Sequence, residues 1–342
     1  MKFDDLYVSG TGLYLADRLP AEDAVAAGLV DARAVRRAGL RSVCVSASES
    51  GPELAVHAAT AALKRSTVRP EDLGLVLHAC TWYQGHDLWA PASFVQDRVA
   101  GNRCPSMEVR QLSNGGLAAV ELAAAYLLAD RSRGDALVTT GDRFAAPAFD
   151  RFHSDPGTIC GDGGAAVLLS TRHGFARLLS LVSVSDPGLE AMGRGDDPFA
   201  TVPMGNRTPV SVDGHRSRLT RELGMNQVLA RMRSGQQEAF RAALEEAGRR
   251  PDDVHRFVLP NLGRPRMQAL LLEPLQLQLP RTTWEWGMSV GHLGAGDQLA
   301  GLAHLADTGD LERGDVVALL GAGAGFSWTV AVLEVDHRPP RE

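Results

Sequence analysis

The stretch from residue 111 to residue 123 reads QLSNGGLAAVELA and holds a candidate nucleophile, Ser113. The alanine- and leucine-rich run that follows predicts a helix beginning next to this serine. A serine at a helix start caps free backbone N–H groups and needs no chemistry. The same position suits a reacting hydroxyl, because those N–H groups and the helix dipole stabilise developing negative charge. Taken alone, this stretch leaves both interpretations open.

A candidate base stands in a second stretch, residues 291–301, which reads GHLGAGDQLAG. His292 precedes a glycine-rich turn, and Asp297 lies near the start of a predicted helix. Asp297 would cap that helix, or it would orient His292 and stabilise its imidazolium. In the second interpretation Ser113, His292 and Asp297 form a nucleophile, a base and an orienting carboxylate. A serine hydroxyl is a weak nucleophile at neutral pH, so it needs such a pair more than a thiol does.

Further residues are candidates for stabilising the negative charge of a tetrahedral intermediate, which requires preorganised hydrogen-bond donors. One candidate donor is the backbone N–H of Ser113. Gly323 and Ala324 are others, in the glycine-rich turn GAGAGFSW, which otherwise reads as a structural hairpin. Asn261 ends the predicted strand RFVLPN, where it is either a turn residue or an amide donor to the site.

The elements that carry these residues occur twice along the chain. AALKRSTVRPEDL begins at Ala61, and AALEEAGRRPDDV begins 181 residues later at Ala242. RGDALVTTG begins at Arg133, and RGDVVALLG begins 180 residues later at Arg313. Each motif leads into an apolar strand, and an alanine-rich helix precedes each RGD turn. Two matches in the same order at nearly the same spacing indicate an internal duplication.

The duplication predicts how residues that are far apart in the sequence meet. Alternating strands and helices indicate an α/β fold with largely buried sheets. We expect two halves, residues 1–172 and 173–342, that pack with pseudo-two-fold symmetry and bring equivalent elements together near the axis. Ser113 and His292 precede equivalent helices, so we expect them to meet although 179 positions separate them.

Some segments fit neither half or carry no clear signal. Residues 186–225 are rich in Gly, Pro, Asp and Arg, and their weak periodicity predicts disorder or a functional loop, interpreted as a cover over a substrate entrance. TWYQGHDLW at 81–89 either lines a pocket, contacts a partner subunit or packs in the core. Five histidines lack ligand spacing and are predicted on the surface or in loops: His57, His78, His86, His153 and His215.

The composition describes a globular protein and argues against several function classes. The 342 residues suffice for two domains or one large duplicated domain. A net charge of −6 gives no reason to expect nucleic acid or an anionic membrane as partner. No apolar run reaches the roughly 20 residues that span a bilayer, and the N-terminus lacks a signal-peptide core. Four scattered cysteines without a CxxC pair predict neither disulfides nor a zinc site, and they suggest the cytoplasm.

Several motifs resemble the thiolase superfamily, and specifically ketoacyl synthase III. CGDGGAAVLL at 160–169 is similar to the GDGAGAVVL strand of that family, and LERGDVVALLGAGAGFSW at 311–328 is similar to its KRGD…GGGFTWG segment. The resemblance extends nearly from end to end, from YVSGTGLYL to GAGAGFSWTVAVLEV. It implies a thiolase-like duplicated fold of five layers, α-β-α-β-α, and a homodimer in which equivalent central strands pair into one continuous sheet.

The candidate catalytic positions depart from that family. Its condensing enzymes carry Cys in ACAGF, His in PHQAN and Asn in GNTSAAS, where this chain has Ser113, Asn261 and His292. Asp297 stands where the family has a small residue. The family uses its His and Asn together to stabilise an enolate, so their exchange argues against decarboxylative condensation. The set instead resembles ketoacyl-synthase-III-like acyltransferases of actinobacterial antibiotic pathways.

The sequence therefore predicts an acyltransferase that forms no carbon–carbon bond. The resemblance implies an acyl-CoA or acyl carrier protein thioester as donor and an acyl-Ser113 intermediate. The acceptor would be a carrier-protein thiol, or a hydroxyl or amine of a polyketide or related secondary metabolite. No metal, tightly bound cofactor, nucleic acid or membrane is expected. Two alternatives stay open: a ketoacyl synthase III-type condensing enzyme that primes polyketide synthesis, and a catalytically silent partner of a ketosynthase.

Overall fold

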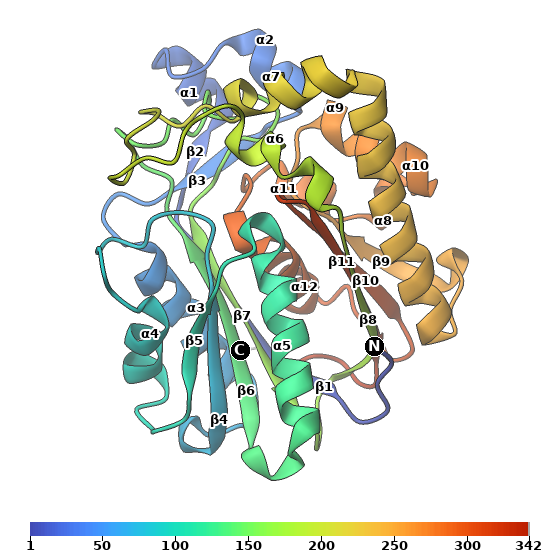
Figure 1. The fold of residues 1–342 in the computed structure, drawn as a ribbon. Coiled ribbons are helices and arrows are strands. Elements are labelled where there is room, and N and C mark those ends of the chain that lie inside the picture. The colour runs from blue at the N-terminus through green and yellow to red at the C-terminus, as the bar shows by residue number, and fades with distance from the viewer. Residues whose placement is uncertain (341–342) are drawn as a thin grey trace.

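The computed structural model describes residues 1–340, and its centre is a nine-stranded mixed sheet (Figure 1). The strand order is β5-β4-β6-β7-β1-β8-β11-β10-β9. β1 and β8 join two parts of this sheet through a short antiparallel contact in which Tyr7 faces Arg177 and Val8 faces Ala176. The two parts have the same internal arrangement, and each is built from one half of the chain.

The first part of the sheet comes from the N-terminal half. Its strands are β1 (Tyr7–Leu15), β4 (Leu73–Ala79), β5 (Ser106–Val109), β6 (Asp135–Asp142) and β7 (Gly163–Ser170). β4 runs parallel to β5 and β6, whereas β7 runs antiparallel to β6 and β1. Every residue of β6 and β7 is buried. Strands that are covered on both faces have this pattern. Their sequences are therefore nearly continuous apolar runs and do not alternate between apolar and polar residues.

The second part repeats this arrangement with strands from the C-terminal half. They are β8 (Ala176–Ser185), β9 (Val254–Val258), β10 (Val316–Gly323) and β11 (Ser327–Val335). β9 and β10 are parallel, and β11 is antiparallel to β10 and β8. β9, β10, β11 and β8 thus correspond to β4, β6, β7 and β1, which confirms the predicted repeat. The turn between β7 and β8 contains residue 172, the predicted end of the first half.

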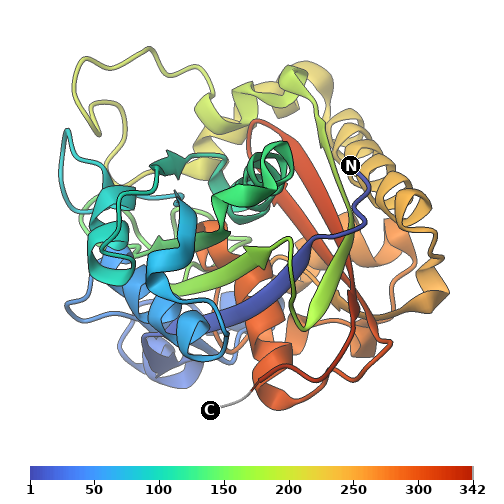
Figure 2. The same ribbon diagram turned by 90° about the horizontal axis from the view of Figure 1, so that it is seen from below.

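Four helices complete the layers. α5 (Gly115–Ala129) and α12 (Asp297–Thr308) lie between the two parts of the sheet, whereas α3 (Gly51–Lys64) and α8 (Met225–Ala247) cover the outer faces (Figures 1 and 2). The predicted α-β-α-β-α order is therefore confirmed. Small residues allow neighbouring layers to approach each other closely. For example, a Cβ on Gly12 of β1 would collide with the backbone of Ala58 in α3. Alanine-rich helices suit such a packed interior.

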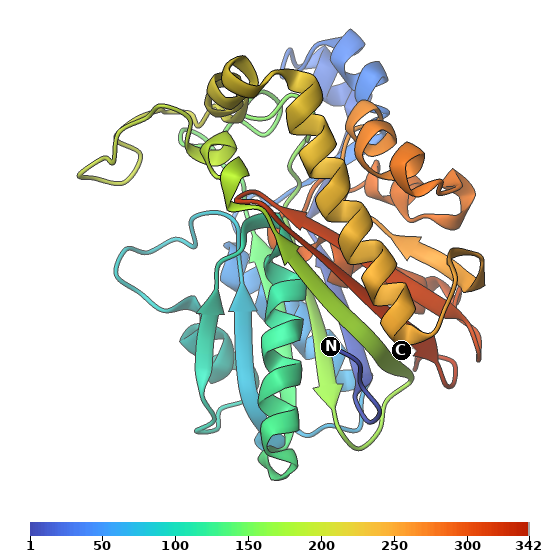
Figure 3. The ribbon, with the colours of Figure 1, turned by 45° about the vertical axis from the view of Figure 1, so that its right-hand side comes forward.

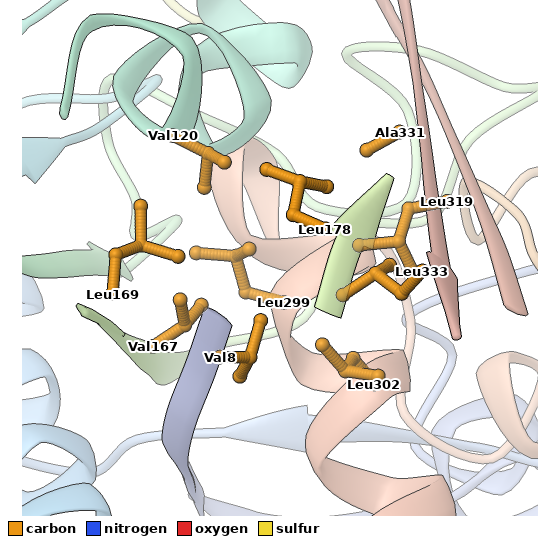
Figure 4. Close-up of a pocket in the computed structure, with 10 residues that line it drawn as sticks. All are labelled: Val8, Val120, Val167, Leu169, Leu178, Leu299, Leu302, Leu319, Ala331 and Leu333. Atoms are coloured by element: carbon orange, nitrogen blue, oxygen red, sulfur yellow. The ribbon is translucent and has the colours of Figure 1, made fainter. Parts of the chain in front are cut away.

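The interior where the two halves meet is almost completely filled. Figure 4 shows ten apolar side chains, from α5, α12 and both parts of the sheet, around a cavity of about 10 Å³. A buried water molecule needs polar partners, and this lining offers none. The two halves are therefore packed against each other as parts of one core.

Shorter elements surround this frame. β2 (Asp17–Pro20) and β3 (Ser42–Val45) form a separate two-stranded sheet. The remaining short helices outside residues 186–225 are α1 (Ala21–Ala26), α2 (Ala32–Ala38), α4 (Pro91–Val99), α9 (Arg264–Met267), α10 (Glu273–Leu275) and α11 (Trp284–Gly287).

The stretch 186–225, predicted to be irregular, is partly helical. It contains α6 (Ala191–Arg194) and α7 (Val212–Leu223), and α7 is capped by Ser211, whose hydroxyl accepts the N–H of Gly214 (3.3 Å). α7 buries only Leu219, so its polar sequence shows no apolar periodicity. The segment between α6 and α7 lacks regular structure and projects from the body of the molecule (Figure 3).

One helical stretch of the described chain, Leu112–Ala129, is long and apolar enough to cross a membrane by length and composition alone. It consists of α5 and the turn before it. Half of it is buried inside the protein, between the two parts of the sheet. We interpret it as a core helix, since such helices pass the same test.

Candidate active site

Ser113 lies in a single 3₁₀ turn, Leu112–Asn114, that leads directly into α5. Its hydroxyl oxygen is 2.8 Å from Nε2 of His292, so the contact expected from the duplication is present. The residue before it, Leu112, has a φ of 47°, in the left-handed region that non-glycine residues rarely adopt. This backbone kink places the serine at the helix entrance and was not foreseen from the sequence.

The capping interpretation of Ser113 is wrong in this structure. Asn114 occupies the N-cap position of α5, and no side chain there bonds to the first N–H groups of the helix. The Ser113 hydroxyl is directed toward His292 instead. Ser113 therefore lies next to the start of α5 but does not cap this helix.

The backbone of His292 is fixed by the segment that precedes β7. Its N–H donates to the carbonyl of Ile159 (2.8 Å), and its carbonyl accepts the N–H of Gly161 (2.9 Å). A Cβ on Gly161 would collide with the carbonyl of Val290, so this close approach requires a glycine. The GDG motif thus supports the histidine, a function that the sequence did not reveal.

Asp297 is the first residue of α12, and its carboxylate is turned back toward the preceding loop. It bonds to Nδ1 of His292 (2.5 Å) and accepts the backbone N–H groups of Leu293 (2.8 Å) and Asn261 (2.8 Å). No side chain caps α12, so the orienting interpretation of Asp297 describes its contacts and the capping interpretation does not. When Nδ1–H of His292 donates to Asp297, Nε2 is left to accept the hydroxyl of Ser113.

The base and its orienting carboxylate are shielded from water, with His292 6% and Asp297 1% exposed, whereas Ser113 is half-buried. Burial disfavours the imidazolium, but the charge of Asp297 and its hydrogen bond outweigh this effect and raise the pKa of His292 above its ordinary value. A histidine with a raised pKa is a stronger base, provided that the solution pH keeps it neutral.

Asn261 contributes to the site in a different way from the predicted donor. Its side-chain amide donates to the carbonyl of Gly291 (2.8 Å) and to Asp297 (3.1 Å), so both N–H hydrogens are occupied within the protein. The residue is 1% exposed, and a Cβ on Gly287 would collide with its amide oxygen. Asn261 holds Asp297 and does not point its amide hydrogens toward a bound substrate.

β9 also ends at Val258, earlier than predicted, because Pro260 cannot donate a ladder bond.

Gly323 and Ala324 lie at the end of the β10–β11 hairpin, next to the turn that carries Ser113. A Cβ on Gly323 would lie 2.9 Å from the backbone nitrogen of Asn114, so hairpin and turn are in close contact. Within residues 1–340 the backbone N–H groups of Ser113 and Ala324 have no hydrogen-bond partner. Both therefore meet one requirement of the predicted oxyanion donors, an N–H group that is not already bonded within the protein.

Asp142, at the end of β6, is a residue that the sequence analysis missed. Its buried carboxylate accepts the backbone N–H groups of Thr81 (2.9 Å), Trp82 (2.7 Å) and Ala295 (3.1 Å). Burial raises its pKa to about 7, against the opposing effect of these N–H groups. It ties the loop after β4 to the loop that carries His292. A polar residue at a buried strand end was the only available signal.

The aromatic stretch after β4 divides between core and surface. Trp82 packs against Phe144 and Phe149, with ring centroids 6.5 Å and 5.0 Å away. Tyr83, by contrast, is 52% exposed, and Leu88 is fully exposed. The prediction that His78 lies on the surface or in a loop is wrong: it is buried in β4 and bonds to Thr139 and Gln84. An isolated histidine in an apolar strand gives no signal of the partners that satisfy it.

Comparisons with known proteins agree with this architecture. Residues 244–335 match the family described as 3-oxoacyl-[acyl-carrier-protein] synthase III, C terminal. The solved structure of ChlB3, an acyltransferase, is 37% identical, with a TM-score of 0.93 and coverage of 98% of this chain and 99% of that one.

More distant relatives cover the chain equally well. The synthase III of Pseudomonas aeruginosa PAO1 is 22% identical with a TM-score of 0.78, and the alignment covers 98% of this chain and 100% of that one. The β-ketoacyl-[acyl-carrier-protein] synthase III of Clostridium beijerinckii is 22% identical over 334 residues, which are 96% of this chain and 99% of the relative. Both halves of the duplicated fold are thus shared with these proteins.

Proposed function

Because the chain belongs to the ketoacyl synthase III-like family of the thiolase superfamily, we propose that it is an acyltransferase with Ser113 as its nucleophile. The observation that carries this proposal is the hydrogen-bonded chain from Ser113 through His292 to Asp297. A hydroxyl, a base and an orienting carboxylate in this order form the arrangement that activates a serine. The similarity to ChlB3, an acyltransferase, supports the same reaction class.

In the first half-reaction, Nε2 of His292 takes the proton of the Ser113 hydroxyl while the oxygen attacks the carbonyl carbon of an acyl thioester. The backbone N–H groups of Ser113 and Ala324 donate to the resulting oxyanion. Asp297 stabilises the imidazolium and keeps the ring in place. The C–S bond then breaks, and His292 returns the proton to the leaving thiolate. The products are an acyl-Ser113 ester and a free thiol.

In the second half-reaction, His292 takes a proton from the acceptor, which attacks the carbonyl carbon of acyl-Ser113. The bond between that carbon and the serine oxygen breaks, and the proton returns to Ser113. The donor is an acyl-CoA or an acyl carrier protein thioester. The acceptor is a carrier-protein thiol, or a hydroxyl or amine of a polyketide or related secondary metabolite. These steps form no carbon–carbon bond and use no tightly bound cofactor.

Decarboxylative condensation is the main alternative, and the names of the relatives at 22% identity favour it. Condensation needs free donors to stabilise an enolate. The amide of Asn261 already donates to Gly291 and Asp297, so it is not free for this purpose. A catalytically silent partner is a further alternative, against which the intact contacts among Ser113, His292 and Asp297 argue.

Intact-mass spectrometry with a panel of acyl-CoA and acyl carrier protein donors tests the proposal. We expect a mass increase equal to the acyl group on Ser113, its loss when an acceptor is added, and no increase in Ser113→Ala. Carbon dioxide and a ketoacyl product from a malonyl carrier protein would favour condensation instead. No adduct with any donor would contradict acyl transfer, and unchanged pathway flux in Ser113→Ala would favour the silent partner.

We also propose that the protein is a cytoplasmic homodimer. β5 is an edge strand, so one side of its backbone is unpaired, and Met107 on it is 48% exposed. Leu88, in the loop before α4, is fully exposed. An edge strand that carries an exposed apolar side chain favours pairing with a second copy of the chain.

A further inference from the structure

The turn that carries Ser113 is fastened to strand β11 by two side chains that the mechanism above does not use. Nε2 of Gln111 donates to the hydroxyl of Ser327 (3.0 Å). Nδ2 of Asn114 donates to the same hydroxyl (3.1 Å) and to that of Thr329 (2.8 Å). One fastening point thus lies two residues before Ser113, and the other lies directly after it. We call these four residues the amide clamp.

The buried part of the amide clamp is closed to water. Asn114 is 1% exposed, Thr329 is fully buried and Ser327 is 7% exposed. The hydroxyl of Thr329 is also 2.7 Å from that of Ser183, which donates to Glu121 of α5 (2.5 Å). Both N–H hydrogens of the Asn114 amide have acceptors, so one side-chain orientation satisfies them and solvent offers no substitute.

The amide clamp encloses the unfavourable backbone conformation of Leu112. A non-glycine residue with φ of 47° persists only where its surroundings over-determine it. Gln111 precedes Leu112 and Asn114 follows two positions later, so hydrogen bonds hold the chain on both sides of the kink. The kink is therefore maintained by contacts with β11 and not by local sequence preference.

Strand β10 brings the backbone close enough for these contacts. A Cβ on Gly321 would collide with the amide oxygen of Asn114, and one on Gly323 would lie 2.9 Å from its backbone nitrogen. The amide oxygen of Asn114 has no hydrogen-bond partner in the described part of the chain. Asn114 therefore acts through its two N–H hydrogens, both directed at β11.

We propose that Gln111 and Asn114 are positioning residues that set the reactivity of Ser113 by fixing its turn against Ser327 and Thr329. This inference rests on the proposed function for the identity of the nucleophile. The fixed turn sets the 2.8 Å distance from the Ser113 hydroxyl to His292, and it also sets the direction of the Ser113 N–H. A displacement of about 1 Å at a reacting group lowers a rate by about 100-fold.

The test is the rate at which a fluorophosphonate probe labels Ser113 in the full-length protein. This probe requires an activated serine but no particular acyl donor. Asn114→Ala removes both donors, and Thr329→Val removes one acceptor with almost no change in volume. We expect both variants to label about 10- to 100-fold more slowly. Thr329→Ser restores the hydroxyl and should label at nearly the rate of the unaltered protein.

Ser180→Ala is the matched control. Ser180 is a fully buried hydroxyl on β8 that donates to the carbonyl of Ala243 (2.6 Å), outside the amide clamp. This control should lower Tm as Thr329→Val does, while its labelling rate stays unchanged. Normal labelling in both Asn114→Ala and Thr329→Val would overturn the proposal. If Asn114→Ala does not fold, the isosteric Thr329→Val decides alone.

Acylation by thioesters, measured on the same proteins, separates this inference from the proposed function. In Thr329→Val we expect a lower kcat with little change in the donor KM, because the amide clamp acts on the nucleophile and not on donor binding. Labelling of Ser113 without acylation by any thioester would refute acyl transfer and leave the amide clamp standing. Normal acylation in the variants would refute the amide clamp alone, and an unlabelled Ser113 in the unaltered protein would overturn both.

Discussion

His292 combines two opposing effects at a single side chain. Burial disfavours its charged form, yet the pKa is raised because the buried carboxylate of Asp297 lies 2.5 Å from Nδ1. A group whose pKa is raised in the folded state stabilises the fold at pH below its unfolded pKa. This contribution is lost as the pH rises through the folded pKa. The base is therefore active in the pH range where it no longer adds to stability.

The first prediction concerns this pH dependence. The acidic limb of the kcat/KM profile should have an apparent pKa above 6.5, because only neutral His292 can take the Ser113 proton. Asp297→Asn should move the limb to lower pH and lower kcat by about 10⁴-fold. Steady-state kinetics between pH 5 and 9 measure both effects. A limb that stays in place in the variant would show that another group titrates.

The second prediction concerns Asn261. Asn261→Ala removes its side-chain bonds to Gly291 and Asp297 and leaves the backbone N–H bond to Asp297. We expect a loss of about 1–3 kcal/mol in the free energy of unfolding, because buried partners lose their hydrogen bonds. The apparent pKa of the acidic limb of the kcat/KM profile should also change, because Asn261 no longer holds the carboxylate that is bonded to His292. A drop of about 10²- to 10³-fold in kcat with an unchanged limb would instead indicate an oxyanion donor.

At this scale the sequence allowed the contact between Ser113 and His292 to be predicted, but not the direction of every side chain. The contact followed from the position of both residues before equivalent helices. Asn261 was placed near the site for a similar reason, yet an amide has donors and an acceptor and fits several orientations. Its actual partners are a carbonyl and a carboxylate contributed by residues 30 and 36 positions away.

At the scale of elements, the N-termini of α5 and α12 determine how nucleophile and base meet. A Cβ on Gly116 would lie 2.6 Å from the carbonyl oxygen of Ala295. A glycine at this crossing therefore lets the two helix entrances approach each other. Ser113 is three residues before this glycine, and His292 is three residues before Ala295.

The third prediction tests this crossing. Gly116→Ala should force the helix entrances apart and lower the free energy of unfolding by about 1–3 kcal/mol. Labelling of Ser113 should slow because its distance from His292 increases. Ala125→Ser, on the exposed side of α5, is the control and should change stability by no more than about 0.5 kcal/mol. Urea unfolding and labelling rates measure the outcome, and a Gly116→Ala protein as stable as the control would refute this packing.

The elements were predictable where the sequence has a strong period or repeats itself. α5, α12, β6 and β10 were found in this way. α7 was missed, because its single buried residue, Leu219, leaves no apolar stripe. The left-handed Leu112 was also missed, because its conformation is imposed by contacts with β11, more than 200 positions away.

At the scale of the whole molecule, the edge strand β5 is the feature with the clearest expected consequence. The fourth prediction is that the protein sediments as a dimer, with β5 at the contact. Met107→Arg would place like charges near the two-fold axis and should weaken association by about tenfold or more. Sedimentation velocity over a range of concentrations measures this effect. An unaltered protein that stays monomeric at micromolar concentration would contradict the prediction.

The duplicated architecture has a further consequence for how such a site can change. One structural feature, a single 3₁₀ turn that leads directly into an inner helix, occurs once in each half of the chain. The first copy presents a hydroxyl, and the second presents an imidazole and a carboxylate. The two copies of the duplicated segment thus have complementary catalytic roles, and neither copy alone provides both the nucleophile and the base. A hybrid protein that joins the N-terminal half of one relative to the C-terminal half of another would take its nucleophile from the first and its base from the second. It would be active only if both relatives use the same combination of nucleophile, base and carboxylate.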